Sequence, residues 1–137
     1  MPTIEGHIND LTLKGYCCSQ LVAIIAGLEP FGEENPATKF PAYDGLLRSL
    51  RGLCIGMFNK KACGALTGGA CALSLHLEGN KLTEACRELA EWFEECFKSV
   101  DCRDLNGAAS APTMICMDIV RETCEKCIEM LMEMDCL

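Results

Sequence analysis

The sequence predicts an all-α fold, a single compact bundle of five to six helices that spans residues 1–137. Apolar residues recur at the three- and four-residue spacing of amphipathic helices along most of the chain. The alternation of β-branched and polar residues that marks strands is missing. Half of the residues are hydrophobic, so a chain of this length can bury one core without crosslinks.

The first half of the chain is predicted to form three helices. The first covers about residues 5–14, and the second covers residues 17–27 and ends at a glycine. Residues 30–41 are predicted to form a loop with three prolines. A third helix is predicted to start near Pro41 and to end after Leu53. The inner face of the second helix is expected to carry Cys18, Leu21, Val22 and Ile25.

The second half is predicted to form three more helices. The fourth begins at about Cys63 with a series of glycines and alanines and ends near Leu77. Glycine inside a helix costs about 1 kcal/mol relative to alanine, so we expect another backbone or a bulky group to approach closely there. The fifth helix shows the clearest apolar stripe, and a loop over residues 99–112 leads to a last helix over residues 113–134. The stripe of the fifth helix consists of Leu82, Ala85, Cys86, Leu89, Ala90, Phe93 and Phe97.

Composition and charge exclude several function classes. The net charge of −8 leaves no cationic surface for nucleic acid or for an anionic membrane. No apolar run approaches the roughly 18 residues of a membrane span. No secretory leader is recognisable, so we expect a cytoplasmic protein whose thiols stay reduced. Twelve thiols oxidise readily in air, which suggests an anaerobic cell.

Cys63 lies between two lysines and a group of glycines. The start of a helix offers free N–H groups and the positive end of the helix dipole, and Lys60 and Lys61 add charge. Both effects lower the pKa of a thiol, so this position predicts a thiolate that acts as nucleophile or metal ligand. The alternative is a close helix crossing through Gly64-x-x-x-Gly68 with an incidental thiol.

Three further cysteines lie near the ends of predicted elements. Cys18 begins the second helix, Cys102 lies in the loop after the fifth, and Cys116 opens the last helix on its inner face. Loops converge at the ends of a helical bundle. Together with Cys63 these residues supply four thiolates, the number that an iron–sulfur cluster or a tetrahedral zinc ion needs.

Other cysteines fit a plain structural role better. Cys124 and Cys127 form a C-x-x-C pair in mid-helix, where two inward thiols are more often core than ligands. The βα context of a thioredoxin motif is absent, and no histidine follows as in a haem attachment site. Cys54, in the link before Cys63, is ambiguous. We keep Cys54, Cys124 and Cys127 as possible substitute ligands.

The order of these motifs resembles one family. The segments are Cys18-Ser-Gln-Leu-Val at a helix start, Cys63-Gly-Ala-Leu-Thr-Gly after a link, Cys102-Arg-Asp-Leu, and Cys116 in the last helix. They are similar to the redox-active proteins named for a Cys…Gly-Cys-Ala-x-x-Gly…Cys…Cys signature, over about residues 16–120. The chain departs from the signature in placing glycine after Cys63, in having Cys54 where glycine is usual, and in its eight additional cysteines.

The resemblance implies an all-helical redox protein of anaerobes whose four signature cysteines hold an iron–sulfur centre or perform thiol chemistry. By position these are Cys18, Cys63, Cys102 and Cys116. The first hypothesis is therefore an electron carrier or store with an iron–sulfur cluster and an unidentified redox partner, rather than a hydrolase or transferase. The alternatives are a thiol–disulfide or sulfur-transfer protein with Cys63 as the reactive thiolate, and a zinc or copper storage bundle. A homodimer is also considered, through Gly64-x-x-x-Gly68 and the methionine-rich C-terminal helix.

Overall fold

A computed structural model describes residues 4–28, 43–106 and 114–134 of the chain. Within these ranges the structure is all-α, as the sequence predicts, and the β-type pairing consists of one isolated antiparallel bridge between Ala62 and Asp101. In the same ranges, no helix combines the length and the apolar character needed to cross a membrane.

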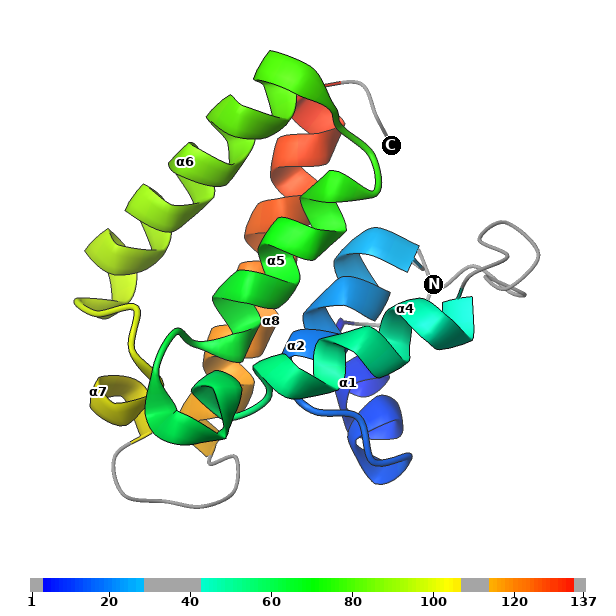
Figure 1. Ribbon diagram of the computed structural model, residues 1–137, viewed down its shortest axis with the longest axis vertical. Helices are drawn as coiled ribbons and strands as arrows, with labels where there is room; N and C mark the ends of the chain where they lie inside the picture. The colour runs from blue at the N-terminus through cyan, green and yellow to red at the C-terminus, as the bar shows by residue number, and fades with distance from the viewer. Residues whose placement is uncertain (1–3, 29–42, 107–113, 135–137) are drawn as a thin grey trace.

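Helix α5 (Gly64–Ser74) lies at the centre of the arrangement (Figure 1). Helix α6 (Gly79–Phe97) flanks α5 on one side, and α2 (Cys18–Val22) flanks it on the other. Helix α2 continues without a break as a π-helical segment, Ala23–Leu28, whose residues are all buried. Helix α8 (Met114–Glu133) contacts α2, α5 and α6, so α5 and α8 together form the support on which the other helices pack.

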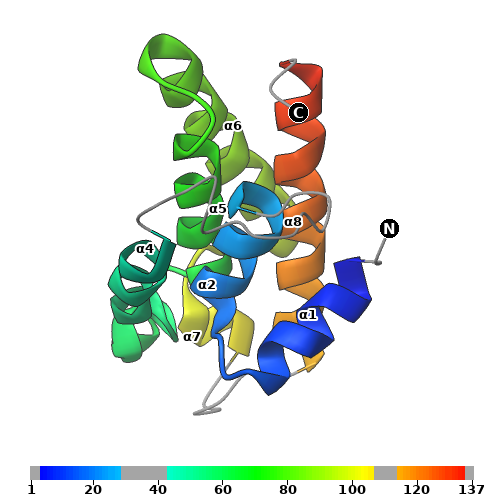
Figure 2. The ribbon, with the colours of Figure 1, turned by 90° about the vertical axis from the view of Figure 1, so that its right-hand side faces the viewer.

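Three shorter helices lie around this centre. Helix α1 (Ile4–Leu13) packs against the lower half of α8 and against α2 (Figure 2). Helix α4 (Tyr43–Ser49) runs into a 3-10 turn, Leu50–Leu53, that contacts α2 and α5. Helix α7 (Cys102–Asn106) contacts the start of α8.

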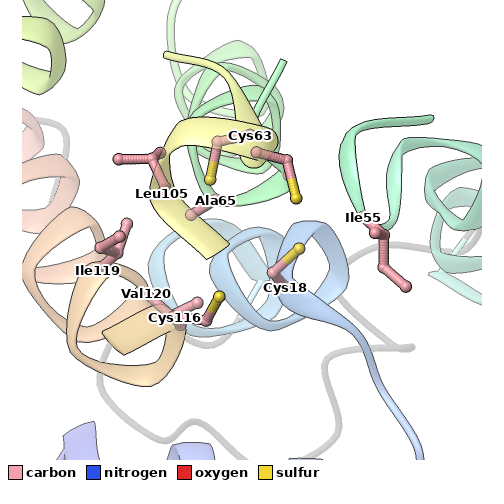
Figure 3. Close-up of a pocket in the computed structure, with 10 residues that line it drawn as sticks. Cys18, Ile55, Cys63, Ala65, Leu105, Cys116, Ile119 and Val120 are labelled. Carbon is pink, nitrogen blue, oxygen red and sulfur yellow. The ribbon is translucent and has the colours of Figure 1, made fainter. Parts of the chain in front are cut away.

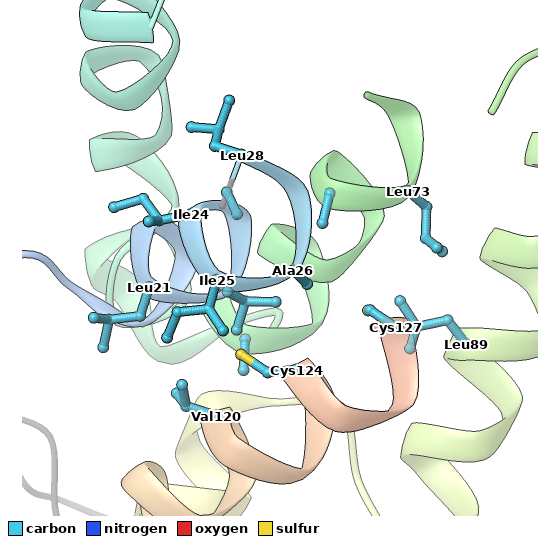
Figure 4. Packing of buried hydrophobic residues seen from close by; sticks show 14 of the residues in the cluster. Leu21, Ile24, Ile25, Ala26, Leu28, Leu73, Leu89, Val120, Cys124 and Cys127 are labelled. Atoms are coloured by element: carbon cyan, nitrogen blue, oxygen red, sulfur yellow. The ribbon is translucent and has the colours of Figure 1, made fainter. Parts of the chain in front are cut away.

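The buried core lies between the α2 segment, α5, α6 and α8 (Figure 4). Leu21 and Ile25 face Val120 and Cys124 of α8, and Leu89 of α6 approaches Cys127. Cys124 and Cys127 are each 0% exposed. The interpretation of this C-x-x-C pair as core is therefore confirmed, because both thiols pack as small apolar groups.

The glycines of α5 allow the backbone of α2 to approach closely. A Cβ atom at Gly68 would collide with the carbonyl oxygen of Ser19, and one at Gly64 would collide with the Cys18 sulfur. The prediction that small residues mark a close approach is thus confirmed. The same contact covers the Gly64-x-x-x-Gly68 face within one chain, so this face is not available for a homodimer.

The segment after α6 differs from the prediction of a loop over residues 99–112. Residues 102–106 form helix α7, and the reason is a local cap. The Ser99 hydroxyl donates a 2.6 Å hydrogen bond to the Asp104 carboxylate and accepts one from the Asp101 amide. The Asp101 carbonyl in turn accepts hydrogen bonds from the Asp104 and Leu105 amides, which closes the first helical turn. Residues 107–112 of the predicted loop lie outside the described ranges, as does Cys136.

Candidate metal or cofactor site

Four cysteines from four segments line one cavity of about 30 Å³. Cys18 begins α2, Cys63 precedes α5, Cys102 begins α7 and Cys116 lies in the first turn of α8. Figure 3 shows the side chains of Cys18, Cys63 and Cys116 directed into the space between α2, α5 and α8. The remaining lining is mainly apolar and comes from Ile55, Gly64, Ala65, Leu105, Ile119 and Val120.

A short backbone pairing holds Cys63 and Cys102 side by side. The Cys63 amide donates to the Val100 carbonyl at 2.7 Å, and the Cys102 amide donates to the Lys61 carbonyl at 2.6 Å. These bonds flank the bridge between Ala62 and Asp101. Two cysteines that are 39 positions apart in the chain thereby enter the cavity from adjacent backbones.

The position of Cys18 depends on a neighbour without a side chain and on an unusual backbone turn. The missing Cβ of Gly64 leaves room for the Cys18 sulfur. The amides of Ile55 and Ser19 donate hydrogen bonds to this sulfur. Ile55 has φ 50° and ψ 45°, a left-handed conformation that is rare for a β-branched residue. A strained residue whose amide faces a thiol in a cavity is typical of a functional site.

Burial changes the acidity that the sequence predicts for Cys63. The cause that dominates is loss of solvation, which raises the pKa of this thiol to about 12 although the amides of Ala65 and Leu66 lower it. The prediction of a lowered pKa was therefore wrong. The helix start does supply N–H groups to the sulfur, but removal from water outweighs them.

The pKa values of two other cavity thiols are also raised by burial. For Cys18 the nearby Cys116 and Cys102 add to the effect, and the amides of Ile55 and Ser19 oppose it. For Cys102, burial raises the pKa, Cys116 raises it further and Lys60 lowers it. The pKa values of Cys18, Cys63 and Cys102 are each raised by the charge of at least one other cavity thiol. The four thiols therefore form one electrostatic group.

The sulfur atoms are near one another but are not at ligand distances. Among the residues that the structure describes, no group of three or more His, Cys, Asp or Glu side chains is close enough to hold a metal ion. The cavity, at about 30 Å³, has room for only a few water molecules. Its donors are of the right kind, four sulfurs with apolar walls and backbone N–H groups, but they must move to enclose an ion or a cluster.

The three possible substitute ligands lie elsewhere. Cys54 is joined to Cys17 in a disulfide with a Cα–Cα distance of 5.9 Å. Cys124 and Cys127 belong to the core and do not line the cavity. While this disulfide is closed, Cys54 has no free thiol that could act as a ligand.

Sequence reasoning missed the contribution of Ile55 and the bond between Cys17 and Cys54. Ile55 acts through its backbone amide, for which its side chain gives no signal. Cys17 and Cys54 are 37 positions apart and belong to no short motif. Only the fold brings the Ile55 amide to the Cys18 sulfur and brings Cys17 to Cys54.

Comparison with known proteins identifies the family of this chain. The profile of the family described as "Putative redox-active protein (C_GCAxxG_C_C)" matches residues 16–130. No curated protein and no solved structure gives a significant match. The match covers most of the chain and extends from α2 through α8, including all four cavity cysteines. The chain therefore belongs to the C_GCAxxG_C_C family of redox-active proteins.

Proposed function

We propose that this protein is an electron carrier that binds an iron–sulfur cluster through Cys18, Cys63, Cys102 and Cys116. The observation that carries the proposal is that these four thiols, and no other cysteine that the structure describes, line the apolar cavity. Clusters of this kind are held by four cysteine thiolates, and they supply one-electron transfer when bound.

The protein's own groups suit this role in three ways. The amides of Ser19, Ile55, Ala65 and Leu66 donate to the sulfurs of Cys18 and Cys63. Such hydrogen bonds stabilise thiolate charge and raise the reduction potential of a thiolate-bound centre. The apolar side chains of Leu105, Ile119 and Val120 limit the access of water. Burial and the nearby Cys116 raise the pKa of Cys102, and Lys60 opposes this increase.

Binding of an iron–sulfur cluster requires the four thiols to lose their protons and to move. Because burial raises the pKa values of Cys18, Cys63 and Cys102, the metal-free thiols are protonated at neutral pH. Iron must displace these protons, so binding should release protons and strengthen as pH rises. The cavity must also widen beyond its volume of about 30 Å³.

The two other functions have less support. A thiol–disulfide or sulfur-transfer reaction at Cys63 needs an accessible thiolate, whereas burial raises the pKa of Cys63 to about 12. A zinc or copper storage role uses the same sulfur donors but requires no inorganic sulfide. Sulfide analysis therefore separates storage from cluster binding.

The test is iron and acid-labile sulfide analysis of anaerobically purified protein, with electron paramagnetic resonance before and after reduction. We expect stoichiometric iron and sulfide, and at least a tenfold loss of both in Cys18→Ser, Cys63→Ser, Cys102→Ser or Cys116→Ser. Cys86→Ser and Cys96→Ser are the matched controls, because neither residue lines the cavity. Circular dichroism checks that each variant folds.

Colourless protein that takes up no iron after anaerobic reconstitution would overturn the proposal. Stoichiometric zinc without sulfide, lost in the same four variants, would instead support metal storage.

A further inference from the structure

The bond between Cys17 and Cys54 lies directly beside the cavity. Cys17 precedes Cys18, and Cys54 precedes Ile55, whose amide donates to the Cys18 sulfur. The nine other cysteines described remain outside any disulfide. In a reducing compartment, which the sequence leads us to expect, a disulfide is usually catalytic or redox-sensing rather than part of a scaffold.

Both half-cystines are held in place without the bond. The Cys17 amide donates to the Gln20 side chain at 3.1 Å, and the Cys17 carbonyl accepts from the Leu21 amide at 2.8 Å. The Cys54 amide donates a hydrogen bond to the Arg51 carbonyl, and the Cys54 carbonyl accepts one from the Phe58 amide. Cleavage of the disulfide therefore leaves the local backbone around each sulfur supported.

The two segments are also tied to each other by side chains. The Ser19 hydroxyl donates to the Leu50 carbonyl at 2.9 Å, and the Gln20 amide donates to the Leu47 carbonyl at 2.8 Å. These bonds join α2 to α4 and the following 3-10 turn. They keep the two thiols near each other after reduction, which favours closure of the same bond on oxidation.

Ser19 provides a partner for the reduced state. Its hydroxyl oxygen lies 3.3 Å from the Cys17 sulfur and 3.9 Å from the Cys54 sulfur. Because the hydroxyl proton is donated to Leu50, the oxygen lone pairs are available to accept an S–H hydrogen. A thiol formed at Cys17 or Cys54 can therefore donate a hydrogen bond to the Ser19 oxygen.

Exposure differs between the two half-cystines. Cys17 is half-buried, whereas Cys54 is buried, with 6% of its surface exposed. A thiolate from outside the protein reaches Cys17 more easily, so Cys54 is the leaving sulfur.

We propose that Cys17 and Cys54 form a second redox site of this protein, a two-electron dithiol–disulfide couple that exchanges with a dithiol reductant. A thiolate of the reductant attacks the Cys17 sulfur and forms a mixed disulfide, while the Cys17–Cys54 bond breaks and Cys54 leaves with the electron pair and takes up a proton. The second thiol of the reductant then attacks its own sulfur in the mixed disulfide. This step releases Cys17, which becomes a thiol, and the reductant leaves as a disulfide that has lost two electrons and two protons.

This couple does not depend on the proposed cluster, so it is tested on metal-free, full-length protein. The native protein is equilibrated with mixtures of reduced and oxidised dithiothreitol, quenched with an alkylating agent and mapped by mass spectrometry. We expect Cys17 and Cys54 to become alkylated together, in one reversible two-electron transition without denaturant. A bond that opens only when the chain is unfolded, or partners other than Cys17 and Cys54, would overturn the proposal.

Two variants test the direction of attack, in a Cys96→Ser background that removes an exposed thiol. With glutathione disulfide as probe, Cys17 in Cys54→Ser should form a mixed disulfide at least about tenfold faster than Cys54 in Cys17→Ser. Equal rates, or faster reaction at Cys54, would refute Cys17 as the attacked sulfur. Iron content plays no part in these readouts, so failure of the cluster proposal leaves them interpretable.

Discussion

At the scale of residues, burial is the main cause that raises the pKa values of Cys63 and Cys127. Cys63 and Cys127 lie in different surroundings, one beside a helix start and one inside α8, yet burial raises the pKa of each to about 12. The N–H groups that face Cys63 reduce this effect without reversing it. A thiol at the start of a helix is therefore activated only when water or a metal also stabilises its charge.

The raised pKa of Cys127 predicts a loss of stability at high pH. An unfolded thiol loses its proton near pH 9, whereas folded Cys127 keeps its proton until about pH 12. The unfolded state thus binds fewer protons above pH 9, and the free energy of unfolding falls as pH rises through this window. Below pH 9 the stabilisation is fully present.

Urea unfolding in a reducing buffer at pH 8 and pH 10 checks this expectation. Cys127→Ala removes one titrating group, so its stability should fall by about 1 kcal/mol less than that of the wild type between the two pH values. Cys96→Ala, at an exposed position, is the control and should follow the wild type. An identical pH dependence in Cys127→Ala and wild type would contradict the prediction.

At the scale of elements, the crossing of α2 and α5 positions Cys18 against the cavity. The contact is made by backbone rather than by interlocking side chains, because Gly64 and Gly68 face Cys18 and Ser19 directly. It also explains why α5 tolerates glycines that weaken an isolated helix. This crossing brings Cys18 and Cys63 to the same cavity.

Gly68→Ala should destabilise the protein by about 1–3 kcal/mol, because the new Cβ would meet the Ser19 carbonyl and the backbone must shift. Gly45→Ala in α4 is the matched control, since a Cβ there meets nothing within 4 Å. The control should be neutral or stabilised by up to about 1 kcal/mol through its better helix propensity. Urea denaturation measures both, and an unchanged midpoint for Gly68→Ala would contradict the close crossing.

At the scale of the whole molecule, the cavity is a meeting point of segments that begin far apart in the chain. Helices α2, α5, α7 and α8 each bring one cysteine at or near their N-terminal ends. A group bound there would crosslink four elements, so it should stabilise the fold as a ligand that binds only the native state.

Iron-loaded protein should accordingly unfold at a higher temperature than protein stripped by a chelator, when both are measured anaerobically. Cys116→Ser should lose most of this difference, and Cys96→Ser should keep it. The same melting temperature with and without iron would show that the metal does not join the elements.

The amino-acid sequence by itself determined the helical class and the approximate extent of most helices, and it singled out the four cysteines that line the cavity. Helical periodicity and glycine placement are local properties of the sequence. They can be recognised there because each helix buries one face. The close approach at Gly64 and Gly68 was foreseeable for the same reason, since only a tight contact compensates for glycine in a helix.

Only the tertiary structure decided the acidity of Cys63, the closure of the Cys17–Cys54 bond and the part played by the Ile55 amide. Desolvation depends on everything that surrounds a sulfur atom, and the cavity that Cys63 lines is also walled by residues of α2, α7 and α8, which are distant in the chain. Lys60 and Lys61 are close to Cys63 in the chain, yet burial dominates the pKa of Cys63, and Lys60 acts on the pKa of Cys102 instead. A disulfide and a backbone hydrogen bond likewise depend on distances between segments of the fold. No local sequence pattern indicates these distances.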